Sequence, residues 1–256
     1  MDRFDSRRAF AELRRQVELG PRPAGSRALR RLAARLRREL PHGRFEDVPG
    51  HRGLRNVVGH LPGRKPAVLV GAHYDTKLLP GFVGANDAAG GTVAVVELAR
   101  ALGDGQRPAG APELRFVLFD GEESPNDKAD FLIAGLRGSK AYARRHRGEL
   151  RAVVLLDFIA DKRLRLPREQ SSTPALWERL RAAARRVGTL TVFPDDTQDR
   201  VLDDHTPFLM QGVPAVDLID FDFPCWHKPC DDMTAVSERS LDLSGETVLE
   251  LLRSWR

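Results

Sequence analysis

Two adjacent carboxylates, Glu122 and Glu123, follow the apolar run 114–119 almost directly. An apolar run of this length that ends near Gly121 predicts a buried strand of an α/β sheet, and such sheets place their chemistry at the carboxyl ends of strands. One glutamate can then ligate a metal ion while its neighbour transfers protons. A solvated acidic turn is the alternative for the pair taken by itself.

Residues of the same chemical kind follow other predicted elements. They are His73 after the run 67–71, Asp87 before a helix over 91–102, Asp157 after the run 152–156, and His227 in the loop after 213–219. Taken singly, they are explained as a strand cap, a helix N-cap, a surface acid and an exposed loop imidazole. Clustered at one sheet edge, unpaired carboxylates would repel one another, so a shared cation is the better explanation. Nitrogen and oxygen donors suit zinc, and no thiolate is needed.

The elements that must position these residues alternate along the chain. Strands are predicted over 57–61, 67–71, 114–119, 152–156 and 213–219, and helices over 10–17, 29–40, 91–102, from about 138, over 174–187 and over 241–252. Ser26 is a plausible N-cap, 124–137 an inserted loop and 104–112 the one candidate linker. This order predicts an α/β fold, a three-layer sandwich with a mostly parallel central sheet and helices on both faces.

Composition fits one large globular domain. The chain has 256 residues, of which 41% are hydrophobic and 30% charged. We expect a single catalytic domain over 1–256 with an Arg-rich helical part over 1–40. No segment approaches the roughly 20 apolar residues of a membrane span, and the charged start Met1-Asp2-Arg3 does not resemble a signal peptide. We therefore expect a cytoplasmic protein that does not enter membranes.

The net charge of +5 is unevenly distributed. Residues 1–40 hold twelve Arg and five acidic residues, whereas the remainder holds 29 basic and 31 acidic residues. Phe4 and Phe10 are the only aromatic residues among these arginines, too few for a base-stacking surface. We therefore expect a solvated helix face and no nucleic-acid partner. The same helices could also form an interface, so the oligomeric state is left open.

Cys225 and Cys230 lie five residues apart around His227. A reducing compartment would keep them as thiols, although the spacing by itself does not decide whether they are bonded. They could also belong to a Cys-x-His-x-x-Cys zinc cluster, but the nitrogen and oxygen ligand set already uses His227.

Five segments, in their order and spacing, resemble the zinc-dependent exopeptidases of the bacterial leucyl aminopeptidase type. They are Ala72-His73-Tyr74-Asp75, Gly84-Ala85-Asn86-Asp87, Asp120-Gly121-Glu122-Glu123, Leu156-Asp157 and Trp226-His227. The turn 20–26 is similar to that family's amino-terminal motif, so the resemblance covers roughly residues 20–235. It implies the zinc-exopeptidase (phosphorylase/hydrolase-like) fold and a peptide or small-molecule substrate with a free N-terminus.

Several features are similar to the glutaminyl-peptide cyclotransferase branch, which closes an N-terminal glutamine to pyroglutamate with loss of ammonia. They are segments 82–84, 154–159, 203–209, Phe223-Pro224 and the insertion 124–137. Segment 86–91 looks more like an aminopeptidase, and Asp217 stands where the cyclases tend to carry a histidine. The resemblance thus implies a cyclotransferase, with a metallo-aminopeptidase as the alternative. A binding module on a scaffold without activity is a third hypothesis.

The resemblance also implies roles. Asp87, Glu123 and His227 are the implied zinc ligands, and Glu122 is the implied acid/base. In the two-zinc aminopeptidases Asp87 would bridge, and His73 and Asp157 would complete a second site. Cyclases carry the same residue types and use one zinc, so we expect one ion and keep two as the alternative.

Three further residues are candidates for supporting roles. Asp157 and Asp203 would form a hydrogen-bonded acidic pair that supports the reaction intermediate. Trp226 would pack against the substrate, or be plain core. Asp75, two residues beyond His73, is well placed to orient an imidazole.

Overall fold

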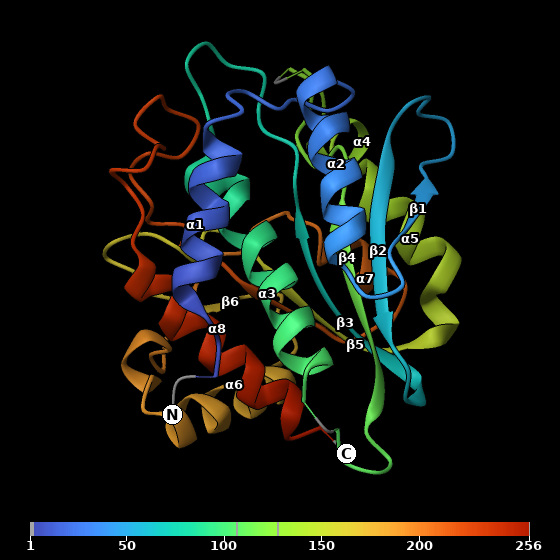
Figure 1. The fold of residues 1–256 in the computed structure, drawn as a ribbon, viewed down its shortest axis with the longest axis vertical. Coiled ribbons are helices and arrows are strands. Elements are labelled where there is room, and N and C mark those ends of the chain that lie inside the picture. The colour runs from blue at the N-terminus through green and yellow to red at the C-terminus, as the bar shows by residue number, and fades with distance from the viewer. Residues whose placement is uncertain (1–2, 106, 127, 256) are drawn as a thin grey trace.

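The computed structural model describes residues 3–105, 107–126 and 128–255. Residues 1–2, 106, 127 and 256 lie outside this description. The structure therefore describes only part of four expected segments, namely the chain start, the linker 104–112, the loop 124–137 and the domain over 1–256. Figure 1 shows the arrangement of the elements.

A six-stranded sheet forms the middle of the molecule, in the order β1-β2-β4-β3-β5-β8 (Figure 1). The last four strands in this order run parallel, and β1 and β2 are antiparallel at one edge. The strands are β1 (Arg44–Asp47), β2 (Arg55–Leu61), β3 (Arg64–His73), β4 (Pro112–Phe119), β5 (Leu150–Leu156) and β8 (Ala215–Leu218). The predicted, mostly parallel sheet is confirmed. Strand β1 was not predicted, because its mainly charged residues contain no apolar run.

Helices cover both faces of this sheet. On one face lie α1 (Ser6–Val17), α2 (Arg27–Glu39), α3 (Gly91–Gly103), α6 (Pro174–Val187) and α8 (Glu238–Arg253), and on the other lie α5 (Arg137–His146) and α7 (Thr206–Met210). The alternation of strand side chains separates the two cores, since Val68 and Val70 pack on the first face and Ala67 and Leu69 on the second. The three-layer sandwich is therefore confirmed.

Smaller elements complete the chain. They are a short helix α4 (Phe131–Ala134) within the expected loop 124–137, a π-helical turn η1 (Ala85–Gly90), 3₁₀ turns η2 (Arg147–Glu149) and η3 (Leu190–Val192), and the strand pair β6 (Arg168–Glu169) and β7 (Thr197–Gln198). No helix in the described part of the chain has both the length and the apolar character that a membrane crossing requires.

The amino-terminal helices are amphipathic, as predicted. Ser26 caps α2, because its hydroxyl oxygen accepts the N–H of Leu29 at 3.0 Å. The apolar stripe of α2 is buried, whereas arginines such as Arg31 are exposed. The basic excess of residues 1–40 therefore belongs to helices that pack onto the sheet through their apolar faces.

The strand register brings the carboxyl ends of the parallel strands together. His73 at the end of β3 is paired with Phe119 at the end of β4, and Leu156 at the end of β5 is paired with Leu218 in β8. The segments that follow these strands therefore start at the same edge of the sheet, where the predicted ligands are expected to meet.

Candidate metal centre

Five side chains converge at this edge in two groups that share Asp87. One group is His73, Asp87 and Asp157, the other is Asp87, Glu123 and His227, and within each group one ligand atom per residue lies within 4.8 Å of the others. Asp87 Oδ1 lies 3.2 Å from His73 Nε2, and Asp87 Oδ2 lies 3.6 Å from His227 Nε2. The structure thus brings together all five residues that were predicted as metal ligands.

The separations between donor atoms fit zinc. Zinc bonds of about 2.0–2.2 Å to nitrogen and oxygen in a tetrahedron place neighbouring donors about 3.3–3.6 Å apart. His227 Nε2 lies 3.2 Å from Glu123 Oε1, and His73 Nε2 lies 3.4 Å from Asp157 Oδ1. Each group can therefore close around one ion after small side-chain adjustments.

The electrostatics of the cluster also indicate a cation. Burial lowers the pKa of His73, but the carboxylates of Asp157, Asp75 and Asp87 outweigh it and raise this pKa well above its ordinary value. Burial raises the pKa of Asp157 to about 7, with the charge of Asp203 adding to the rise and His73 opposing it. The raised pKa values show that the negative charge of these buried carboxylates is poorly compensated by the protein. A bound divalent ion would stabilise the carboxylates in their charged form.

Asp87 is presented by the turn η1, in which its own backbone leaves the helical conformation (φ −111°, ψ 87°). The peptide bond after Asp87 is cis. Gly84 enters this turn with φ +57°, and a Cβ added there would lie 2.0 Å from the carbonyl oxygen of Asp87. Both conditions require glycine at this position.

Arg22 joins the amino-terminal turn to this segment. The side chain is fully buried, and its guanidinium donates to the carbonyl oxygens of Gln16, Gly20, Val83 and Gly84. Burial lowers the pKa of Arg22 to about 10, although the charges of Asp231 and Asp87 oppose the shift. The predicted motif at 20–26 therefore serves to fix the loop that carries Asp87.

Asp75 does not hold His73 by a hydrogen bond, contrary to the prediction, because His73 Nδ1 and Asp75 Oδ1 lie 3.8 Å apart. Its carboxylate instead accepts the backbone N–H groups of Gly121, Glu122 and Glu123 at 3.0, 3.1 and 3.3 Å. The turn after β4 needs an acceptor for these three donors, and Asp75 thereby fixes the backbone that presents both glutamates.

Glu122 lies outside both ligand groups, and its side chain lines the cavity in front of them. Its Oε2 is 3.9 Å from His73 Nδ1. Burial raises the pKa of Glu122 well above its ordinary value, and the charge of Glu123 adds to this effect. A carboxyl group beside the metal ligands but not among them is available for proton transfer.

The cavity in front of the ligands has a volume of about 520 Å³. Its apolar wall contains Trp226, whose side chain is 44% exposed, and Phe221, with ring centroids 5.0 Å apart. Phe158 stacks on Phe221 at 6.2 Å. Trp226 therefore lies at the mouth of the cavity, and the alternative that it is plain core is wrong.

Asp157 and Asp203 both line this cavity, and the hydrogen-bonded pair expected of them stays a prediction. Asp157 Oδ1 accepts the N–H of Phe158 at 3.0 Å, and Asp203 Oδ1 accepts the N–H of Asp204 at 2.5 Å. Asp203 Oδ2 has no hydrogen-bond partner among the described residues.

A buried triad beneath the cavity was not predicted as a unit. His205 is fully buried, with Nε2 3.3 Å from Glu169 Oε2 and Nδ1 3.3 Å from Asp217 Oδ2. Asp203, His205 and Asp217 also form a third group with ligand-capable atoms close together. Asp217 can be singled out in the sequence because it is a charged residue within the apolar run 213–219. Glu169 lies in a polar segment, where a charged residue does not stand out.

Cys225 and Cys230 form a disulfide that encloses Trp226 and His227. The expected thiols are therefore not observed, and the alternative of a zinc cluster with cysteine ligands is wrong. The turn brings the two Cα atoms to 5.4 Å, well within the range that a disulfide spans. The bond constrains the loop that carries one of the five ligands.

Comparison with known sequences gives consistent relatives. A model of peptidase family M28 matches residues 56–252. The chain is 29% identical over 239 residues to the glutaminyl-peptide cyclotransferase of Bothrops jararaca, covering 75% of this chain and 63% of that protein. It is 30% identical over 232 residues to the Bos taurus glutaminyl-peptide cyclotransferase, covering 75% and 64%. The chain thus spans a little under two thirds of these curated relatives.

Solved structures give similar neighbours. The glutaminyl cyclase of an Acidobacteriales bacterium has a TM-score of 0.84 at 26% identity, covering 98% of this chain and 94% of that chain. The Porphyromonas gingivalis glutaminyl cyclase has a TM-score of 0.85 at 26% identity, covering 98% and 99%. A leucine aminopeptidase precursor from Bacteroides thetaiotaomicron has a TM-score of 0.86 at 24% identity, covering 99% and 98%, which shows a shared fold.

Proposed function

This chain belongs to peptidase family M28, and from that membership we propose that it is a zinc-dependent glutaminyl-peptide cyclotransferase. Its reaction would convert an N-terminal glutamine to pyroglutamate and release ammonia. The observation that carries the enzymatic part of the proposal is the position of Glu122, beside a zinc-type ligand group but outside it, at the cavity. The likeness to glutaminyl cyclases in sequence and in structure supports cyclisation as the reaction.

Asp87, Glu123 and His227 would hold the zinc ion, whose chemistry when bound is to polarise the side-chain amide carbonyl of the glutamine. We propose one ion in this group, because His227 is part-exposed at the cavity, whereas the His73 group is deeply buried. His73 and Asp157 would then support the ligand Asp87 by their contacts with it or with each other.

Glu122 would take a proton from the α-amine as the amine nitrogen attacks the amide carbonyl carbon and closes a five-membered ring. The same glutamate would return the proton to the amide nitrogen, whose bond to carbon breaks, so that ammonia leaves. No water is consumed, because the substrate supplies its own nucleophile at high effective concentration.

The cavity walls suit a peptide amino terminus. Asp157 and Asp203 would accept hydrogen bonds from the substrate's amine and amide N–H groups, since both line the cavity and Asp203 Oδ2 has no hydrogen-bond partner in the described part of the chain. Trp226 and Phe221 would pack against the apolar part of the substrate.

A metallo-aminopeptidase is the second candidate, favoured by one observation: both ligand groups are complete and share Asp87, as a two-ion centre requires. Glu122 would then take a proton from the water that attacks the first peptide bond. A binding module without activity is the weakest hypothesis, because the residues proposed as ligands and as the acid/base group lie together at one cavity.

Mass spectrometry of a Gln-initiated peptide incubated with zinc-loaded protein separates these hypotheses. We expect a loss of about 17 mass units, one ammonia, with the chain intact, because cyclisation consumes no water. Release of the first residue would instead establish the aminopeptidase, and an unchanged peptide would favour the binding module.

The variant Glu122→Gln tests the acid/base role, since it keeps the shape of the side chain and removes the proton acceptor. We expect turnover to fall by at least about 100-fold while the zinc content is retained. Glu178→Gln, an exposed change of the same kind on α6, is the matched control. Retained turnover in Glu122→Gln would show that another group transfers the proton.

A further inference from the structure

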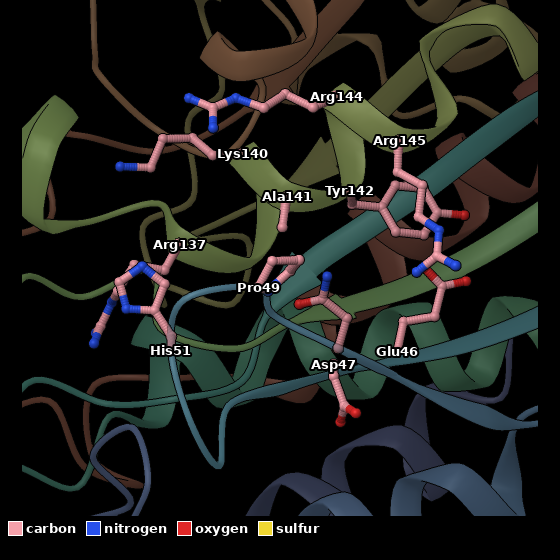
Figure 2. A pocket seen from close by; sticks show the side chains of 11 residues that line it. Glu46, Asp47, Pro49, His51, Arg137, Lys140, Ala141, Tyr142, Arg144 and Arg145 are labelled. Carbon is pink, nitrogen blue, oxygen red and sulfur yellow. The ribbon is translucent and has the colours of Figure 1, made fainter.

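A second cavity, also of about 520 Å³, lies between α5 and the segment from β1 to β2 (Figure 2). It shares no lining residue with the cavity at the metal centre. From α5 it is lined by Tyr142 and by residues three or four positions apart, namely Arg137, Lys140, Ala141, Arg144 and Arg145. One helix face thus presents four cationic side chains to a cavity of the size that small-molecule sites have, about 300–1,000 Å³.

The positive charge gathers at one end of this cavity. In Figure 2, Arg137 and His51 lie at the same side, and Lys140 and Arg144 extend toward that side. Burial lowers the pKa of His51, and the charges of Arg137 and Lys140 lower it further. Burial also lowers the pKa of Lys140, with Arg144 and Arg137 contributing. These basic groups are therefore close enough to repel one another.

The described residues offset this charge only in part, and Asp47 is a carboxylate that also lines the cavity. Lys140 donates to the carbonyl oxygens of Leu132 and Ile133, and the charges of Asp130 and Asp204 oppose the lowering of its pKa without reversing it. The nearby Glu46 is already compensated, because it pairs with Arg44 at 2.7 Å and with His146 at 3.0 Å. An anion at this end would relieve the repulsion.

Arg137 connects this cavity to the metal centre. Its Nε donates to the carbonyl oxygen of Gly121 at 3.0 Å, and its Nη2 donates to the carbonyl oxygen of Glu123 at 2.7 Å. The backbone N–H of Leu136 donates to the carbonyl oxygen of Glu122 at 2.8 Å. The start of α5 therefore holds the same turn that presents the proton-transfer residue and a metal ligand.

We propose that this cavity binds a small phosphate-bearing molecule, and that its binding slows the reaction at the metal centre through Arg137. A phosphate group carries about −1.5 to −2 charges and accepts paired hydrogen bonds from guanidinium groups, which suits a cavity lined by Arg137, Lys140 and Arg144 better than a single carboxylate does. A phosphate that draws Arg137 into the cavity would weaken its hydrogen bonds to Gly121 and Glu123. The binding half stands by itself, whereas the regulatory half rests on the proposed function.

Calorimetric titration of the zinc-loaded protein with inorganic phosphate, at constant ionic strength set by chloride, tests the binding half. We expect one site, with affinity at least tenfold weaker in Lys140→Gln/Arg144→Gln and unchanged in Arg27→Gln/Arg31→Gln. The second variant removes the same charge from exposed positions on α2. Equal weakening in both would show general charge attraction and overturn the proposal. Binding that survives Lys140→Gln/Arg144→Gln but is lost in Glu123→Gln would place the phosphate at the metal centre and also overturn it.

Cyclisation of the Gln-initiated peptide, with and without phosphate, tests the regulatory half. We expect kcat to fall at least twofold with KM unchanged, and we expect this effect to disappear in Lys140→Gln/Arg144→Gln. Phosphate binding without any change in kcat would overturn the regulatory half. A protein that binds phosphate at this cavity but never cyclises the peptide would refute the proposed function and leave the binding site established.

Discussion

The backbone N–H of Asp87 donates a hydrogen bond to the carboxylate of Asp231 at 3.1 Å, across 144 residues of sequence. The other carboxylate oxygen of Asp231 accepts the N–H of Asn86 at 2.8 Å. Asp231 is fully buried, and its carboxylate is a member of neither ligand group. One carboxylate thus fixes the backbone of the ligand that both groups share.

Asp231→Asn should weaken zinc binding by about 10–100-fold, because the amide keeps one acceptor and loses the other, and supports of metal ligands have effects of this size. Competition with a chelator measures the affinity. Asp222→Asn, the same change at an exposed position of a neighbouring loop, should have no effect. Equal affinity in Asp231→Asn and in the unmodified protein would show that the turn holds Asp87 without this contact.

Acid should destabilise the fold through Glu169. Five donors and the imidazole of His205 surround this fully buried carboxylate. Burial raises its pKa, but the hydrogen bonds from His205 and Ser171 outweigh burial and lower the pKa to about 2, from 4.5. The unfolded chain therefore binds the proton first as the pH falls. The stabilisation, about 3 kcal/mol, is complete above pH 4.5 and is lost as the pH falls toward 2.

Urea unfolding at several pH values between 7 and 3.5 checks this dependence. Glu169→Gln should be less stable at pH 7, and its stability should fall less steeply below pH 4.5 than that of the unmodified protein. Glu178→Gln, exposed on α6, should follow the unmodified protein throughout. Parallel curves for Glu169→Gln and the unmodified protein would mean that this carboxylate has a normal pKa in the folded state.

The disulfide between Cys225 and Cys230 should contribute to zinc binding, because it encloses His227, whose backbone has a φ of +52°. A thiol reagent should detect no free cysteine in the protein as purified under oxidising conditions. Closing so short a loop lowers the conformational entropy of the zinc-free chain by an amount equivalent to at most about 2 kcal/mol, so Cys225→Ser/Cys230→Ser should weaken zinc binding by up to about 30-fold. Two free thiols in the purified protein, or unchanged zinc affinity in the variant, would contradict this role.

The strand ends were predictable because their physical basis is local. Apolar runs such as 67–71 and 152–156 predict buried strands, and parallel strands bring their carboxyl ends to one edge. That rule predicts that His73, Glu123 and Asp157 meet without knowledge of strand order. Asp87 and His227 were candidates from their residue types, but they lie on loops whose paths periodicity does not define, and the family resemblance assigned both as zinc ligands.

The tertiary structure alone decided which groups hold these ligands. Asp75 binds the backbone of the Glu122 turn instead of His73, because three N–H donors there lack other acceptors. Glu169 pairs with His205, and Cys225 reaches Cys230, through turns whose geometry the residue pattern does not specify. The residue types and their order thus determined the chemistry at the sheet edge. The apolar runs define the buried strands, and the polar residues that follow each run define the groups at the strand ends. The supporting contacts depend on how separate loops pack against one another, which only the folded chain defines.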